Sequence, residues 1–283
     1  MLARGPPKII AEGLDAEPNA VAESCEKAML KIKRDQLLAF EAKAQRSFED
    51  EMVSHLRGFA PGRCEELDDE QLRAAVRDGI VRADGYGFTN RGPLRLFLEC
   101  MLMFGAHFDT DPQYPAFAAR LRAKGEQMFR AQCIYDEIVE YQAVVLGKGG
   151  VNLRKALTAL LALARSGGAR VDDEGASMLS ALTSSFPEKA AYVGRDGLRE
   201  LIRRGRAGAS GYGLQGARPE TALVAAMFAL GHGVARDWSY PTVQQALADV
   251  SVRETSASAA RLESTLLSLV ARTLADITKG AQR

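Results

Sequence analysis

The sequence predicts an all-α fold made of two related helical units. The main observation is a repeat: the stretch Gly79–Leu121 matches the stretch Gly205–Leu247 at a constant offset of 126 residues, without a gap. Such self-similarity indicates one supersecondary unit built twice. The second observation is that no run of alternating β-branched residues occurs in the chain. Identical residues at this offset include Gly85-Tyr86-Gly87 with Gly211-Tyr212-Gly213, Pro93 with Pro219, Gly105 with Gly231, Asp111 with Asp237, and Tyr114 with Tyr240.

We divide the chain into an arm, two units and a linker. Pro6, Pro7 and Pro18 indicate an extended or loose arm at the start. The sequence Gly147-Lys148-Gly149-Gly150 is typical of a linker or a tight turn. The expected parts are a flexible N-terminal arm over 1–19, a first helical repeat unit over 20–146, a glycine-rich linker over 147–150 and a second helical repeat unit over 151–283.

The first unit is expected to contain four helices. Asp68 or Asp69 can cap the second, because its carboxylate can accept the free N–H groups of the first helical turn. The third has Pro93 in its first turn, where a missing N–H costs nothing, and Gly105 at its end. Its residues are apolar almost all round, which is typical of a central core helix. The expected ranges are 20–56, 68–84, 90–104 and 116–146.

The second unit is expected to repeat this order of helices. A second central helix, starting at Pro219, corresponds to the one that contains Pro93. A break at Ser166-Gly167-Gly168 interrupts the first helical stretch of this unit. The expected ranges are 151–164, 174–184, 197–209, 219–230, 243–248 and 257–277.

The two Gly-Tyr-Gly sequences are interpreted as structural motifs. Gly85 and Gly87 can end one helix, and the ring of Tyr86 then packs in the corner before the next helix. The same interpretation applies to Gly211-Tyr212-Gly213. No strand precedes either copy and no Gly-Lys-Ser/Thr follows, so neither fits a dinucleotide-binding or phosphate-binding loop.

One segment could carry chemistry. Asp109 and Asp111 form an Asp-x-Asp beside His107, so an alternative interpretation is an enzyme or toxin with an unrecognised site at these three residues. The favoured interpretation is that Asp111 and Asp237 cap turns or pair with a neighbouring helix. Two carboxylates are too few for an oxygen-ligated cation, and Asp109 aligns with Ala235 in the second copy. Since no known catalytic motif occurs, we expect no catalytic residue, no metal and no cofactor.

Arginines on one predicted helix are the best candidates for binding a partner. Arg195, Arg199, Arg203 and Arg206 fall on one helical face at steps of four, four and three. Such a face is either simply solvated or a dock for an acidic partner or phosphate groups. Trp238, the only tryptophan, is a second candidate, because tryptophan is enriched at interface hot spots; internal packing is its other interpretation.

Composition argues against several classes of protein. A net charge of +1 argues against a nucleic-acid binder, although the arginine face keeps that as a third hypothesis. No stretch of 18 apolar residues occurs, so no membrane span is expected, and the first residues lack the apolar core of a signal peptide. The four cysteines are far apart, with no Cys-x-x-Cys. We therefore expect reduced cysteines and a cytoplasmic location.

The segment from Phe97 to Pro115 resembles a family of helical proteins often encoded beside bacterial type VI secretion genes. The matching features are Tyr86-Gly87, a hydrophobic helix ending at Gly105, Asp109-Thr110-Asp111-Pro112 and Tyr114-Pro115. The resemblance covers roughly residues 35–125, and the second copy follows it loosely, with Trp238 in place of the proline. It implies an accessory role near a secreted toxin, as adaptor, chaperone or immunity protein. The expected function is accordingly non-catalytic binding of a toxin, effector or secretion component.

Overall fold

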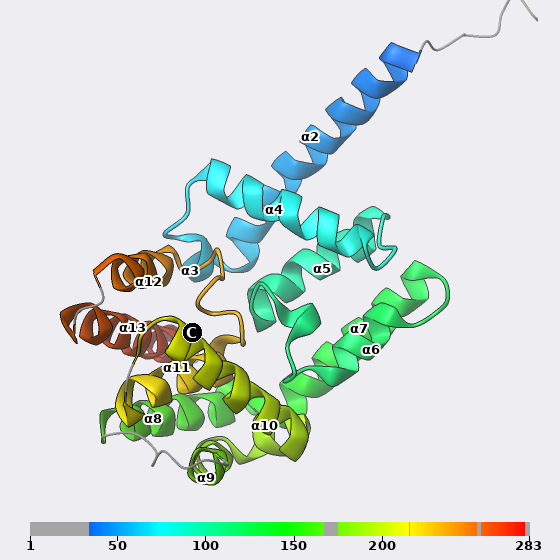
Figure 1. Cartoon of the computed structure of the whole chain (residues 1–283). Coiled ribbons are helices and arrows are strands. Elements are labelled where there is room, and N and C mark those ends of the chain that lie inside the picture. Colours follow the sequence, from blue (N-terminus) through cyan, green and yellow to red (C-terminus); the bar gives the residue numbers. More distant parts are fainter. Residues whose placement is uncertain (1–33, 167–174, 215, 254–255, 281–283) are drawn as a thin grey trace, which may run out of the picture. The chain divides into compact units, whose positions relative to one another are not determined.

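A computed structural model describes residues 34–166, 175–214, 216–253 and 256–280, and all regular structure among them is helical (Figure 1). The predicted all-α class is therefore confirmed. The α-helices are α2 (Arg34–Phe59), α3 (Pro61–Cys64), α4 (Asp69–Asp84), α5 (Arg91–Phe104), α6 (Pro115–Arg122), α7 (Gln127–Tyr141), α8 (Val151–Arg165), α9 (Ala176–Ser185), α10 (Pro187–Gly211), α11 (Ala217–Leu230), α12 (Pro241–Arg253) and α13 (Ser256–Gly280). Three short helices complete the set: η1 (Phe108–Thr110), η2 (Gln142–Leu146) and η3 (Lys148–Gly150).

The chain divides into two compact units within helix α2, between Ser47 and Phe48. The described part of the smaller unit is the first half of α2, where Leu37 and Phe40 are exposed. From Phe48 onward α2 belongs to the larger unit and buries the apolar positions of its inner face. The expected arm over 1–19 lies outside the described residues.

Two helices form the centre of the core. In α5, Leu98 and Met101 are buried, as expected for a helix with almost no polar face. In α11, every residue from Thr221 to Phe228 is buried. Helix α4 packs along α5, and α10 packs along α11 (Figure 1). The prediction of two central core helices is confirmed.

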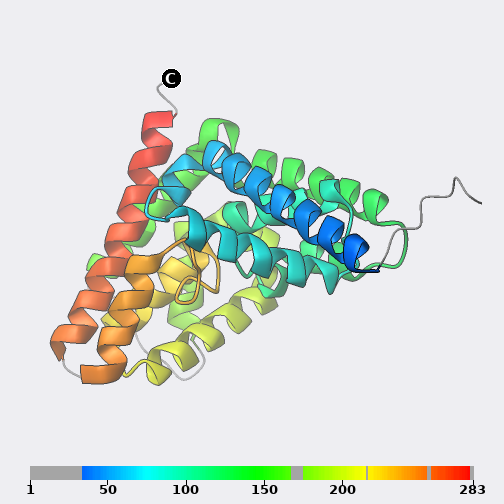
Figure 2. The same ribbon diagram turned by 90° about the horizontal axis from the view of Figure 1, so that it is seen from above.

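The remaining helices cover this centre. Helix α13 packs against α12, α11 and α8, and α12 and α13 lie side by side (Figure 2). Helix α7 packs against α5 and α6. Among the described cysteines, Cys64 and Cys100 are buried free thiols and Cys133 is a half-buried one.

The helix boundaries follow local chemistry. The Asp68 carboxylate accepts the Gln71 amide N–H, and the Gln71 side chain accepts the Asp68 amide N–H, so the two residues form a capping box at the start of α4. Gly87 has φ +70° and follows the turn that ends α4. The Tyr86 ring then packs 6.1 Å from the Phe97 ring, as predicted for the corner between α4 and α5.

The prediction of one helix over 116–146 is wrong, because two helices and a π-helical turn occupy these residues. Helix α6 ends before Gly125, whose φ of +124° cannot continue an α-helix. The Glu126 carboxylate then accepts the Phe129 N–H and starts α7. The π-helical turn η2 ends at Gly147, where the predicted glycine-rich linker begins.

Candidate binding surface on helix α10

Asp111 and Asp237 each accept a hydrogen bond from a backbone amide in the other half of the molecule. The first half is the part of the larger unit before the glycine-rich segment 147–150, and the second half is the part after it. Oδ2 of Asp111 accepts the N–H of His232, and Oδ2 of Asp237 accepts the N–H of Ala106, both at 2.7 Å. Each Oδ1 also accepts the amide N–H two residues further along its own chain, at 2.9 Å. Both carboxylates are buried. The predicted turn-capping role is therefore confirmed, and the same bonds join residues 121 and 131 positions apart.

The ends of α5 and α11 meet at two glycines. Gly105 and Gly231 have φ +96° and +110°, a region that side-chain-bearing residues rarely adopt. A side-chain carbon on Gly105 would lie 2.8 Å from the carbonyl oxygen of Leu230, and one on Gly231 would lie 2.6 Å from that of Phe104. This approach brings the Asp111 and Asp237 turns together.

Tyr114 and Tyr240 each receive a cation from the other half of the molecule. Lys189 lies over the Tyr114 ring at 5.3 Å and donates to its hydroxyl at 3.3 Å and to the Phe228 carbonyl at 2.5 Å. The Arg63 guanidinium lies over the Tyr240 ring at 5.3 Å and donates to its hydroxyl. Burial lowers the pKa of Lys189 to about 8. Both tyrosines therefore make contacts inside the fold.

The residues of the alternative enzyme interpretation make internal contacts. The buried Asp109 carboxylate accepts from the Arg82 guanidinium and, at 3.0 Å, from the Tyr86 hydroxyl. The His107 ring packs on Gly233, and burial, followed by the charge of Arg82, lowers the pKa of His107. In the described parts of the chain, no group of three or more His, Cys, Asp or Glu is placed to hold a metal ion.

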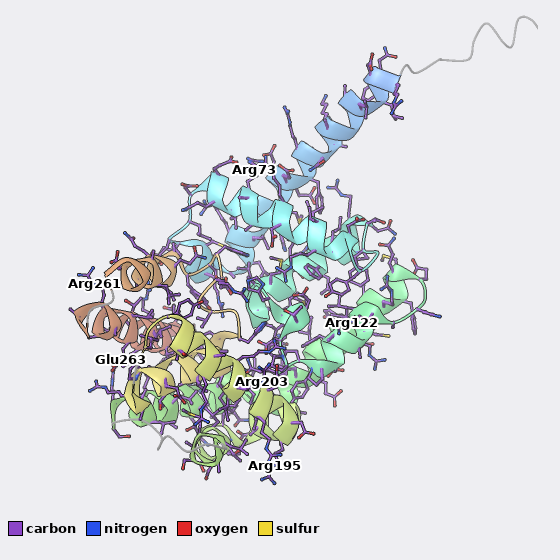
Figure 3. The ribbon with its side chains drawn as sticks, viewed as in Figure 1. Arg73, Arg122, Arg195, Arg203, Arg261 and Glu263 are labelled. Carbon is purple, nitrogen blue, oxygen red and sulfur yellow. The ribbon has the colours of Figure 1, made fainter. Side chains whose placement is uncertain are left out.

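Helix α10 carries the predicted arginine face. Gly194, with φ +75°, kinks the helix, and Arg195, Arg199 and Arg203 are exposed on the segment that follows. Figure 3 labels Arg195 and Arg203 on this helix. Arg206 is half-buried and pairs with Glu220 of α11 at 2.8 Å. The exposed face therefore has three of the four predicted arginines.

Trp238 is only half-exposed and packs against the hydrophobic core. Its Nε1 is buried and has no hydrogen-bond partner among the described residues. The side chain therefore belongs mainly to the packing of the turn that also holds Asp237.

A pocket of about 420 Å³, which the sequence did not predict, adjoins the arginine face. Three arginines contribute to its lining: Arg203 and Arg204 from α10, and Arg236 from the turn before α12. Both α10 arginines donate to Glu200, at 2.7 and 2.8 Å, and these bonds lower the pKa of Glu200 to about 2. The exposed Arg236 has no carboxylate partner among the described residues. The other lining residues are Ala207, Gly208, Tyr212, Leu223, Met227, His232, Gly233 and Ala235.

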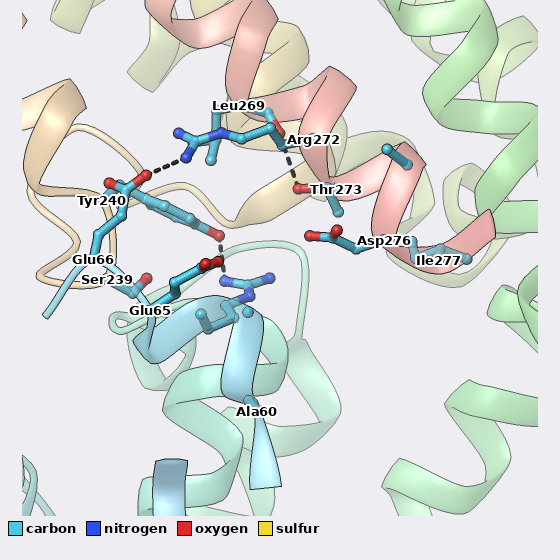
Figure 4. Close-up of a pocket in the computed structure, with 13 residues that line it drawn as sticks. Ala60, Glu65, Glu66, Ser239, Tyr240, Leu269, Arg272, Thr273, Asp276 and Ile277 are labelled. Carbon is cyan, nitrogen blue, oxygen red and sulfur yellow. Dashed lines mark hydrogen bonds and ion pairs between the residues drawn. The ribbon is translucent and has the colours of Figure 1, made fainter. Parts of the chain in front are cut away.

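A second pocket, of about 470 Å³, lies between α3, the turn at Tyr240 and α13 (Figure 4). Arg272 of α13 pairs with Glu66 across it, and Arg63 binds the Tyr240 hydroxyl. Both arginines of this pocket therefore already have partners. The α10 pocket has the unpartnered Arg236, so we take it and the arginine face as the candidate site.

Comparisons of the chain with protein families, curated proteins and solved structures found no match. Among the described residues, no helix combines the length and the apolar character that a bilayer-spanning segment needs.

Proposed function

We propose that the protein is a non-catalytic binding protein whose α10 face docks an acidic surface of a partner protein. The observation that carries this proposal is that Arg195, Arg199 and Arg203 are exposed on one face, with Arg236 beside them at the pocket. Arg195 and Arg199 lie four residues apart on the helix, and like charges at this spacing repel by a few tenths of a kcal/mol, whereas Arg203 is already paired with Glu200. An acidic partner removes this repulsion and associates faster at low salt.

The same proposal accounts for the Asp-x-Asp segment without catalysis. Asp109 is held by Arg82 and Tyr86, and Asp111 caps the turn at His232. Carboxylates engaged in this way stabilise the fold and have few lone pairs left for a substrate or a metal.

We further infer that the larger unit arose by internal duplication with an offset of 126 residues. Helices α5 and α11 both contain 14 residues, and their first residues are 126 positions apart. The two aspartate caps are reciprocal at this offset, and so are the two cation–tyrosine contacts. An experimental structure with unrelated backbone paths over 67–121 and 193–247 would overturn this inference.

The biological context that we propose is accessory to a secreted bacterial toxin or to type VI secretion, as adaptor, chaperone or immunity protein in the cytoplasm. Its support is the resemblance carried by Tyr86-Gly87, Gly105 and Asp109-Thr110-Asp111-Pro112. Such a role needs a surface for a protein partner, which the α10 face supplies.

The test is a pull-down with the products of neighbouring genes, followed by calorimetry of any complex at low and high salt. We expect Arg199→Glu combined with Arg203→Glu to weaken binding at least tenfold at low salt, because rim charges act through long-range attraction. The matched control is Arg120→Glu with Arg122→Glu, the same charge change on exposed residues of α6. Equal losses in both double variants, or none in either, would contradict the proposed surface.

A further inference from the structure

The α10 pocket lies where the first half of the molecule has an ion pair. In the first half, the Asp109 carboxylate accepts from the Arg82 guanidinium and the Tyr86 hydroxyl. At the offset of 126, Arg82 corresponds to Gly208 and Asp109 to Ala235. Both of these small residues line the pocket. The second half thus lacks two large side chains at this place.

The second half has hydrogen-bond donors at this place although it has no carboxylate there. Tyr212 stands at the position of Tyr86 and lines the pocket, and its hydroxyl has no acceptor among the described residues. Arg203, Arg204 and Arg236 supply guanidinium groups at the wall, and Glu200 neutralises one of these three charges. The pocket therefore has a phenol, an excess of two positive charges and no carboxylate of its own.

We propose that this pocket receives the carboxylate of an Asp or Glu side chain from the partner protein, in the place that Asp109 fills in the first half. This rests on the proposed function, because it names what the acidic partner inserts beside the α10 face. The Tyr212 hydroxyl donates one hydrogen bond to the incoming carboxylate, and Arg236 donates the charge-assisted ones. A volume of about 420 Å³ accommodates one such side chain.

The pair of bonds that Asp109 makes in the first half favours a carboxylate. The planar Asp109 carboxylate accepts a hydrogen bond from the Arg82 guanidinium on one oxygen and from the Tyr86 hydroxyl on the other. The second half keeps the phenol at the corresponding position and adds a guanidinium at the next position along from Ala235, at Arg236. A phosphate would also find guanidinium donors at this wall, so inorganic phosphate is one of the probes in the test.

The probes for the test are the peptide acetyl-Glu-Glu-Glu-Glu-amide, its all-Gln counterpart, glutarate and inorganic phosphate. Each is titrated into the full-length protein by calorimetry at low salt. We expect the Glu peptide to bind and the Gln peptide to give no heat. If glutarate binds as tightly as the Glu peptide, the pocket is a site for small dicarboxylates. If phosphate binds more tightly than the Glu peptide, it is a phosphate site. Either result overturns the proposal.

Two variants with matched controls locate the binding in the pocket. Ala235→Asp places an internal carboxylate there and should weaken the Glu peptide at least tenfold, whereas Ser210→Asp adds the same charge on α10 outside the pocket and should change affinity less than twofold. Tyr212→Phe should weaken the peptide about threefold to tenfold, because one hydrogen bond to a charged group is lost. Tyr86→Phe, at the corresponding position of the first half, should leave affinity unchanged.

The outcomes separate this inference from the proposed function. If Arg199→Glu weakens binding of the partner while Ala235→Asp and Tyr212→Phe do not, the arginine face stands and the pocket proposal is overturned. Arg199 does not line the pocket, so its substitution reports on the face alone. If none of the three variants weakens binding, both proposals are overturned. Melting temperatures of all variants are measured to check that each remains folded.

Discussion

Residues 60–122 and 186–248 are two stretches that correspond in sequence at the offset of 126 residues; they have several turn and cap contacts in common and differ in the side chains between them. The residues that start them, Ala60 and Phe186, have φ/ψ of −137°/68° and −144°/75°, and each precedes a proline that begins a helix. In both stretches an aspartate caps the turn after the core helix. The framework residues are those that fix backbone direction. The residues between them differ, and the binding pocket arises at such a difference.

A second difference concerns the cation that faces each tyrosine. Lys189 is buried and binds Tyr114. The Tyr114 ring contacts the Tyr141 ring, which in turn contacts the Tyr192 ring. Arg63, at the corresponding place, lines the open pocket beside α13. The cation is therefore fully buried in one stretch and only half-buried in the other, and burial depresses the pKa of Lys189.

The largest expected effect comes from breaking the glycine contact that joins the stretches. Gly105→Ala and Gly231→Ala should each lower the free energy of unfolding by about 3 kcal/mol or more, because the backbone conformation is almost reserved for glycine and the new carbon would collide with a carbonyl oxygen. Urea denaturation followed by circular dichroism measures the loss.

Gly213→Ala is the control for this pair. Gly213 also has a positive φ, +67°, but a carbon added there meets nothing within 4 Å. Its substitution should cost only about 1 kcal/mol, from backbone strain alone. A loss at Gly105 or Gly231 no larger than that at Gly213 would show that the close approach of the two helix ends is unimportant.

Local signals in the sequence predicted most of the framework. Pro93 and Gly105 mark the first and last turns of α5, and their counterparts do so for α11, because missing N–H groups and positive φ are properties of single residues. The break at Gly125 was missed, since an isolated glycine is also tolerated within a helix. Glu126 as the following cap was the available signal.

The pocket could not be predicted from local patterns. It arises from the absence of side chains at Gly208 and Ala235, and small residues have meaning only when compared with Arg82 and Asp109. The pairing of Arg206 with Glu220 was also hidden, because these residues lie 14 positions apart on different helices. Helical periodicity places a side chain on a face but does not say which neighbour meets it.

A smaller expected effect is a pH dependence of stability that Lys189 causes and Arg63 does not. The folded-state pKa of Lys189 is about 8, below its ordinary value of 10.5, so the unfolded chain binds more protons between these values. Lys189 should therefore add about 2 kcal/mol to the free energy of unfolding between pH 7 and pH 9.5. Burial raises the pKa of Cys64 and Cys100, and these thiols act in the opposite direction over the same range, so the effect is measured as the stability difference between wild type and Lys189→Met. This difference should change by about 2 kcal/mol over the range, whereas the difference between wild type and Arg63→Met should change much less. A wild-type to Lys189→Met difference that stays constant across this range would show that Lys189 is not desolvated as described.

The smallest expected effect on stability comes from removing the hydroxyl groups of Tyr86 and Tyr212. Tyr86 and Tyr212 occupy corresponding positions, but only the Tyr86 hydroxyl meets a carboxylate, at 3.0 Å from Asp109. Tyr86→Phe should cost about 1 kcal/mol of unfolding free energy, because the buried Asp109 loses a donor. Tyr212→Phe should change stability by less than about 0.5 kcal/mol, since no partner is lost in the unliganded protein.

Repeating this measurement with Ala235→Asp in the background turns the comparison into a test of equivalence. With a carboxylate restored in the pocket, Tyr212 should regain an acceptor, and Tyr212→Phe should then cost about as much as Tyr86→Phe. If Tyr212→Phe stays neutral in that background, the two positions are not equivalent in space, and the pocket has a different geometry from the site that Asp109 fills. If the cost appears, the second half differs from the first mainly in having no carboxylate of its own at this place, which leaves room for one from another molecule.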